Sequence, residues 1–250
     1  MIVNQHEKGW EVIYHRAHAL LAAQIAGHWN PKLRPVRWLQ TIAAISHHDD
    51  LEKEWEGNHL TPAGAPRDFT QEKEIDLERL KKHTLNSQYR GRWVAMLISM
   101  HTSFLGEGLR GESPELDAFL DEQLQNQEKW REELNISKDD AAEAYAFFQW
   151  CDRMSLILCK HEIPEGSTGP ADSEDFRALE IAKDGSGQSY SVSQSSDGNV
   201  TVTPWAFAED KFTVSLDACY LEQLQFKDND ELTEALLNSK IKSLEWTFVK

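Results

Sequence analysis

Apolar residues recur at intervals of three and four along the first 160 residues, the spacing of helices that bury one face. Pro31 ends the first of these segments, Pro35 opens the second, and Gly106 closes the fourth. Ser137 stands at an N-cap position before the last one. The pattern predicts helices over residues 8–28, 35–49, 70–86, 93–105, 115–134 and 137–160, and a loop over residues 57–69.

The pattern changes after Pro164. Residues 165–171 are rich in Gly, Ser and Pro and predict a junction. Apolar and polar residues then alternate, which is typical of strands, and Asp197-Gly198 predicts a hairpin turn between the first two. The expected elements are strands at residues 190–194, 200–207, 212–222 and 241–249 and a short helix at residues 230–238.

These elements predict an α+β fold in two unequal parts. Residues 1–163 would form a mainly α-helical bundle, and residues 164–250 a small C-terminal antiparallel β subdomain. Because the second part has few apolar residues of its own, we expect it to pack on the helices. All ten histidines lie at or before His161, which places the candidate chemistry in the first part.

The sequence His-His-Asp-Asp at residues 47–50 ends the second predicted helix. Two imidazoles and two carboxylates in four positions are hard to explain as packing, because ionised carboxylates are rarely buried without compensation. The apolar run before them indicates a helix face directed at the core. A metal ion would compensate these charges, and the alternative is a helix end whose polar residues face water.

Three other predicted helices carry a polar residue on an apolar face. Each has a simpler explanation alone: a core histidine can hydrogen-bond to a carbonyl, and Asp152 could pair with a local cation, although Arg153 points about 100° away from it. Helical bundles build metal sites from such inward side chains. We therefore predict one metal site formed by side chains from separate helices, namely His18, His48, Asp49, Asp152 and His101.

Imidazole and carboxylate ligands without thiolate suit Mn²⁺, Fe²⁺, Co²⁺, Ni²⁺ or Zn²⁺ in a site that retains water. Cys151 and Cys159 lie among apolar residues, as core cysteines do. A six-coordinate ion with four protein ligands would keep about two open positions, where an acidified water can attack phosphorus. The ligand types therefore predict a divalent metal ion and hydrolytic chemistry.

The formal net charge of −16 argues against nucleic-acid polymers and anionic membranes as partners and leaves a small-molecule substrate. No apolar run is long enough to span a bilayer, and the first ten residues do not resemble an export signal. Cys151 and Cys159 lie roughly 12 Å apart along one predicted helix and cannot form a disulfide. We expect a cytoplasmic protein, and the sequence leaves its oligomeric state open.

The order His18, His48-Asp49, Asp152 resembles the HD metal-dependent phosphohydrolase superfamily, whose ligands run His, His-Asp and Asp over successive helices. A closer resemblance is to an uncharacterised HD-like family of about this length, a family of unknown function. It rests on residues 18–24, 48–50, 64–69, 99–101, 151–159 and 204–207. The resemblance implies an HD-like bundle that binds metal through these four residues, with His101 as an additional ligand and with Asp49 and His101 as catalytic residues.

The same resemblance implies that Asp49 would bridge two ions if His101 bound the second. HD hydrolases commonly continue the doublet with a small residue and a nearby lysine, whereas residues 50–53 are Asp-Leu-Glu-Lys. Only one extra histidine stands out. We therefore expect one ion, with a second only if further ligands join His101.

Three arginines have the guanidinium geometry that suits phosphate, although exposed arginines are more often solvated: Arg16, Arg67 and Arg153. Trp55 and Phe69 could cover a ring of the substrate or anchor the loop. The predicted function is a metal-dependent phosphohydrolase acting on a small phosphorylated compound or nucleotide. The alternatives are a di-iron oxygenase on the same scaffold and a non-catalytic metal-binding or regulatory protein.

Overall fold

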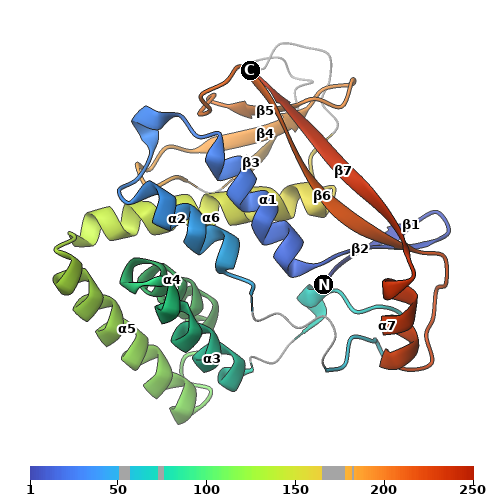
Figure 1. The fold of residues 1–250 in the computed structure, drawn as a ribbon, viewed down its shortest axis with the longest axis horizontal. Helices are drawn as coiled ribbons and strands as arrows, with labels where there is room; N and C mark the ends of the chain where they lie inside the picture. The colour runs from blue at the N-terminus through green and yellow to red at the C-terminus, as the bar shows by residue number, and fades with distance from the viewer. Residues whose placement is uncertain (51–56, 73–75, 165–177, 182) are drawn as a thin grey trace.

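The computed structural model describes residues 1–50, 57–72, 76–164, 178–181 and 183–250 of the chain. The α-helices in these ranges are α1 (His15–Gly27), α2 (Trp38–His47), α3 (Leu77–Ser87), α4 (Arg92–Glu107), α5 (Pro114–Leu134), α6 (Lys138–Cys159) and α7 (Asn229–Leu237). Helices α2 to α5 lie on the left of Figure 1, and α7 lies on the right beside the strands. Short 3₁₀ helices are η1 (Pro31–Leu33), η2 (Phe69–Gln71) and η3 (Gln88–Arg90).

One sheet contains the strands β1 (Ile2–His6), β2 (Gly9–Ile13), β3 (Leu179–Ile181), β4 (Tyr190–Gln194), β5 (Val200–Thr203), β6 (Lys211–Leu221) and β7 (Lys240–Val249). Their order is β1-β2-β6-β7-β5-β4-β3. Neighbours are antiparallel except β5 and β7, which are parallel, so the sheet is mixed. Strands β6 and β7 form the long ribbon on the right of Figure 1, in register from Lys211↔Val249 to Tyr220↔Lys240.

The prediction of a mainly helical bundle with a small C-terminal antiparallel β subdomain was wrong. Within the described residues the sheet has seven strands in a mixed arrangement. Two of them, β1 and β2, come from the N-terminal part, and the pair Trp10↔Leu221 joins β2 to β6. The division between residues 163 and 164 stays a prediction, and the sheet takes strands from both sides of it. The predicted junction at residues 165–171 lies outside the described residues.

The hairpin of β1 and β2 was missed because its local pattern is ambiguous. Residues 9–13 alternate like a strand, but the apolar positions from residue 10 onward also fit helical spacing. A run of this length does not distinguish a strand from a helix. The pairing with β6 decides instead. A Cβ atom at Gly9 would lie 1.9 Å from the carbonyl oxygen of Leu221, so glycine is required for this close approach. The first helix consequently begins at His15.

The other predicted helices are present with shifted ends. The side chain of Ser137 accepts a hydrogen bond from the backbone N–H of Asp140 and caps α6, as its sequence indicated. Helix α3 begins at Leu77 because the side chain of Asp76 caps it, accepting from the N–H of Arg79. Among the helices described, none has both the length and the apolar character needed to cross a membrane.

The core between helices and sheet centres on Trp29, which follows α1 and is fully buried. Its ring lies 4.7 Å from that of Trp150 on α6 and 5.6 Å from that of Tyr190 in β4. Large aromatic side chains contribute much of the apolar area that a core buries. This packing fixes α1 and α6 relative to each other, and these two helices carry His18 and Asp152.

Candidate metal centre

Helices α1, α3, α4 and α6 and the end of α2 line a cavity of about 700 Å³. Residues three, four and seven apart share one face of a helix, and the lining residues follow this spacing. On α6 they are Gln149, Asp152, Arg153 and Leu156. Each helix therefore presents one face to the same space, and the cavity collects side chains that are distant in the sequence.

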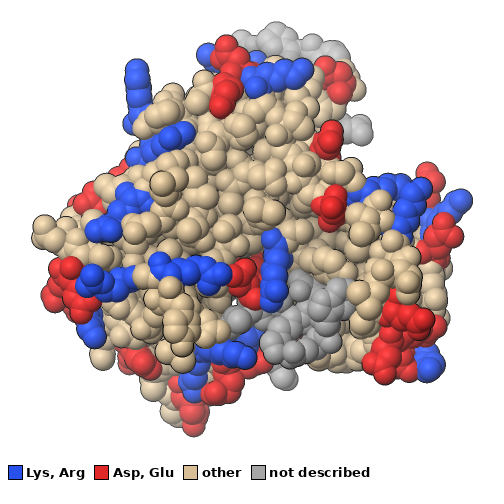
Figure 2. Space-filling model, in the orientation of Figure 1, with Lys and Arg blue, Asp and Glu red and all other residues tan. Residues whose placement is uncertain are grey.

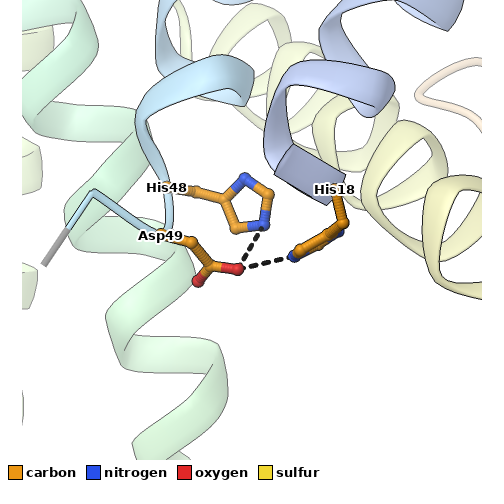
Figure 3. Close-up of side chains that lie close together, drawn as sticks. All are labelled: His18, His48 and Asp49. Atoms are coloured by element: carbon orange, nitrogen blue, oxygen red, sulfur yellow. Dashed lines mark hydrogen bonds and ion pairs between the residues drawn. The ribbon is translucent and has the colours of Figure 1, made fainter. Parts of the chain in front are cut away.

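The C-terminal end of α2 delivers His48 and Asp49 to this cavity. His48 is buried, and its Nδ1 lies 2.6 Å from the carbonyl oxygen of Ile45. Because a carbonyl can only accept, Nδ1 carries a proton and Nε2 is the nitrogen available to a ligand. Nε2 faces the carboxylate of Asp49, with 3.5 Å between Nε2 and Oδ2 (Figure 3).

His18 of α1 approaches the same carboxylate oxygen, with its Nε2 2.6 Å from Oδ2 of Asp49 (Figure 3). On the other side of the ring, Nδ1 lies 2.9 Å from Oγ of Ser155. Ser155 donates its own proton to the backbone carbonyl of Asp152 at 2.8 Å, so its oxygen accepts from Nδ1 of His18. His18 therefore also presents Nε2 as its ligand nitrogen.

Asp152 completes the group from α6. Its Oδ1 lies 3.2 Å from Nε2 of His48 and 3.9 Å from Nδ1 of His18. This oxygen is buried and accepts no hydrogen bond from the described part of the chain. We call His18, His48, Asp49 and Asp152 the His/Asp cluster.

His101 of α4 lies beside the cluster. It is buried, and its ring centre lies 5.3 Å from that of His48. The ring stacks on Phe148 at 5.0 Å, and Nδ1 is 3.4 Å from the hydroxyl of Tyr145. Burial and the nearby charge of His48 lower the pKa of His101 to about 4, so this imidazole is neutral and able to bind a metal ion.

The charges within the cluster are strongly coupled. Burial alone lowers the pKa of His48, but the charges of Asp49 and Asp152 raise it to about 10. Burial likewise opposes ionisation of the two carboxyl groups, yet His48 holds the pKa of both below its usual value. Both carboxylates are therefore ionised at neutral pH and require a positive partner, which a protonated imidazole or a metal ion can supply.

The donor set fits a metal ion. Two sets of three residues place one ligand atom each within 4.8 Å of one another: His18, His48 and Asp49, and His48, His101 and Asp152. In the described part of the chain, Oδ1 of Asp152 accepts no hydrogen bond but lies 3.2 Å from Nε2 of His48. A divalent cation that displaced the proton of His48 could bind the same carboxylates and imidazoles. The cluster could therefore hold an ion.

The outer members of the His-His-Asp-Asp sequence do not join the cluster. Nδ1 of His47 makes a short contact with the carboxylate of Asp50. Arg90 binds both residues, with 3.1 Å from Nη1 to Nε2 of His47 and 2.9 Å from Nη2 to Oδ2 of Asp50. The inner pair faces the cavity, and the outer pair ties the end of α2 to η3.

The three predicted phosphate-binding arginines are not together. Arg153 lines the cavity next to Asp152. Arg16 donates to the backbone carbonyl of Asp50 and lies outside the cavity lining, and Arg67 lines a separate, smaller pocket. Of the three, only Arg153 is placed to contact a ligand of this cavity.

The loop after α2 reaches the cavity through Phe69. Its ring lies 5.1 Å from that of His15, and Nζ of Lys160 lies 4.9 Å from the ring centre. Phe69 therefore anchors the loop and also forms part of the cavity wall. Trp55 and residues 51–53 lie outside the described residues.

His83 of α3 also lines the cavity and was missed in the sequence. It is buried, and neither ring nitrogen has a hydrogen-bond partner in the described part of the chain. Burial and the charge of His47 lower its pKa to about 4. One sequence pattern could have indicated it. His83 follows Leu80 by three residues, so both lie on the face of this charged helix that carries its few apolar residues.

Comparison with known proteins gives one match. The model of a family described as "Protein of unknown function (DUF3891)" matches residues 1–223. It gives no link to the HD superfamily, so that resemblance rests on the ligand order and the motifs alone. The chain shows no match to a curated protein and none to a solved structure. The protein belongs to the DUF3891 family of uncharacterised function.

Proposed function

We propose that this protein is a metal-dependent phosphohydrolase acting on a small phosphorylated compound. The observation that carries the proposal is the buried Oδ1 of Asp152, which accepts no hydrogen bond within the described chain and lies among ligands that suit a divalent ion. The order of the ligands along the chain resembles that of HD phosphohydrolases and supports the same assignment.

The His/Asp cluster would hold one ion, and Mn²⁺, Fe²⁺, Co²⁺, Ni²⁺ and Zn²⁺ are the candidates. A second ion would draw on His83 and His101, two neutral imidazoles that line the same cavity. When bound, such an ion acidifies water and neutralises charge on phosphoryl oxygens.

Besides holding the ion, the residues of the chain have two tasks in this proposal. Ser155 and the carbonyl of Ile45 orient the two imidazoles. Arg153 lies where its guanidinium can bind a phosphate oxygen. In the reaction, water adds to phosphorus, the P–O bond to the alcohol breaks, and the alcohol leaves with the proton that water loses.

The partner would be a small molecule. A cavity of about 700 Å³ matches the size of small-molecule sites. The net charge is −16, and on the face drawn in Figure 2 Lys and Arg are interspersed with Asp and Glu. This distribution offers no advantage to a nucleic-acid polymer. The three free, buried cysteines fit a reducing compartment such as the cytoplasm.

Elemental analysis of protein purified without added metal tests the site. We expect about one divalent ion per chain or more, and loss of most of it in Asp49→Ala, because this carboxylate contacts both imidazoles of the cluster. Asp121→Ala is the control, since this exposed residue of α5 pairs with Arg110 instead. Normal metal content in Asp49→Ala would refute the ligand assignment.

Turnover tests the reaction. Phosphate release from members of a phosphoester panel, with Mn²⁺, Co²⁺ or Ni²⁺ supplied, is the expected result. The histidine-rich lining also suits iron. Oxygen consumption by iron-loaded protein without phosphate release would favour a di-iron oxygenase, and metal binding without any turnover would favour a binding or regulatory protein.

A further inference from the structure

Part of the cavity lining is apolar. It consists of side chains from η2, α3, α4 and α6, here called the apolar wall: Phe69, Leu80, Phe104, Leu105 and Leu156. Phe104 is 60% exposed and Leu105 is 50% exposed. Single exposed apolar residues need no explanation, but apolar residues that share a cavity indicate a contact surface for a ligand.

The apolar wall begins next to the metal-binding side chains. Leu105 follows His101 by four residues on α4, and Leu156 follows Asp152 by four residues on α6. Residues four apart lie on one face, separated by about one turn of roughly 5.4 Å. A ligand with its reacting group at the His/Asp cluster would therefore reach the apolar wall within the length of a few bonds.

The charged residues of the lining limit the charge that a ligand can carry. Outside the His/Asp cluster, the described lining contains two guanidinium groups, Arg79 and Arg153, and two carboxylates, Glu72 and Asp76. Arg79 lies 3.9 Å from Glu72, and Arg153 lies 3.1 Å from Glu162. The part of the lining that the structure describes offers no cationic track to a nucleoside polyphosphate, whereas a single phosphate group carries a charge of only about −1.5 to −2 at pH 7.

We propose that the substrate is the phosphate monoester of an apolar alcohol, with its phosphate facing the His/Asp cluster and its hydrocarbon part along the apolar wall. The phosphate group of this substrate rests on the proposed function, and its hydrocarbon part is inferred from the apolar wall. Hydrolysis would consume one water, break the P–O ester bond, and release inorganic phosphate and the neutral alcohol, whose oxygen takes the proton that water loses.

Binding of methyl-, butyl- and octylphosphonate to the metal-loaded full chain tests this inference, because water does not cleave their P–C bond. The dissociation constant measured by calorimetric titration should fall by about fourfold for each methylene that the wall buries. Equal dissociation constants for the three probes, no binding of any probe, or tighter binding of adenosine monophosphate than of octylphosphonate would overturn it.

Two matched variants locate the binding surface. Leu105→Ser should weaken octylphosphonate binding about tenfold and leave methylphosphonate binding unchanged. Leu124→Ser on α5 is the control, since Leu124 is 51% exposed and lies outside the cavity lining. Equal effects of the two variants on octylphosphonate would contradict the assignment of the wall.

The two proposals fail in distinguishable ways. If binding strengthens with chain length but no phosphoester is hydrolysed, the apolar ligand class stands and the hydrolase proposal is wrong. If short and long esters release phosphate with the same kcat/KM, hydrolysis stands and the present inference is wrong.

Discussion

The protein contains two clusters in which buried carboxylates meet imidazoles, and the clusters differ in how the carboxylate is satisfied. In the His/Asp cluster, Oδ1 of Asp152 accepts no hydrogen bond from the described residues. In the second cluster, both oxygens of Glu11 in β2 accept hydrogen bonds. Both carboxylates are ionised and shielded from water, so the difference lies in their partners.

The second cluster consists of Asn4, Glu11, His161 and Tyr220, here called the Glu11 cluster. Oε1 of Glu11 accepts from Asn4 at 2.9 Å and from Nε2 of His161 at 2.7 Å, and Oε2 accepts from the Tyr220 hydroxyl at 2.5 Å. Asn4 also donates to the carbonyl of Cys159 at the end of α6. The cluster joins three strands to a helix and is complete without an ion.

The comparison teaches that burial and charge alone do not identify a ligand. A buried carboxylate whose hydrogen bonds are complete holds elements together, whereas an oxygen that faces imidazoles without a hydrogen bond keeps a lone pair that a cation can use. Changes in the Glu11 cluster should therefore affect stability, and changes in the His/Asp cluster should affect metal binding.

The largest expected effect on stability comes from Glu11→Ala. It removes the acceptor from three donors, one of them the half-buried amide of Asn4, and should lower the free energy of unfolding by about 3 kcal/mol. Chemical denaturation measures this loss, and elemental analysis should show unchanged metal content. Glu222→Ala, at an exposed position just after β6, should stay within about 0.5 kcal/mol of the wild type. Loss of metal without loss of stability would reverse the roles of the two clusters.

Ser155→Ala should have a smaller effect, confined to the His/Asp cluster. Without Oγ, Nδ1 of His18 loses the partner that orients its ring, and the loss of such a partner typically lowers metal affinity about 10- to 100-fold. Competition with a fluorescent chelator measures the affinity. Ser99→Ala is the matched control, because Ser99 is equally buried but hydrogen-bonds to Gln123. Equal metal affinities in the two variants would remove Ser155 from the site.

The smallest effect is the pH dependence of the Glu11 cluster. Burial opposes ionisation of Glu11, but hydrogen bonds from His161, Tyr220 and Asn4 lower its pKa to about 2 from the usual 4.5. The hydrogen bond to Glu11 raises the pKa of His161 above its usual 6.5. The contribution of Glu11 is therefore lost as pH falls from 4.5 towards 2. The contribution of His161 to stability is complete below pH 6.5 and is lost as the pH rises through the raised pKa of this histidine.

Comparison of the wild type with His161→Asn in denaturation experiments at several pH values tests this window. Asn tolerates the left-handed backbone at this position, where φ is 53°. The destabilisation should be greatest between pH 4.5 and 6.5 and should stay below about 1 kcal/mol, because half of the imidazole is exposed and solvent screens it. A difference that grows above pH 8 would contradict the ion pair.

Sequence reasoning found the residues of the His/Asp cluster because each is a polar exception on an apolar helix face. It missed His83, because α3 is charged and its apolar face is too sparse to make an imidazole stand out. Of the four residues at positions 47–50, only His48 and Asp49 were predicted as ligands, and that choice came from the resemblance to HD phosphohydrolases. The structure separates His47 and Asp50 from this pair because both contact Arg90, which lies 43 residues after His47 and 40 residues after Asp50.

The fold was predicted only in part. Helices α4, α5 and α6 follow from long periodic segments with clear caps, whereas β1 and β2 are too short for periodicity to identify. Their strand conformation depends on β6, whose residues lie some two hundred positions further along the chain. Strand pairing at this distance leaves no local pattern, so the extent of the sheet was underestimated.

By itself, the sequence determined which side chains are of a type that could bind a metal ion and on which helices most of them lie, because residue type and helical spacing are local properties. Only the tertiary structure decided which of them meet. The hydrogen bond between His18 and Ser155 spans 137 residues, and the cavity with its apolar wall exists only once six segments have packed together. Contacts of this kind depend on the packing of the whole chain, and no short stretch of residues specifies them.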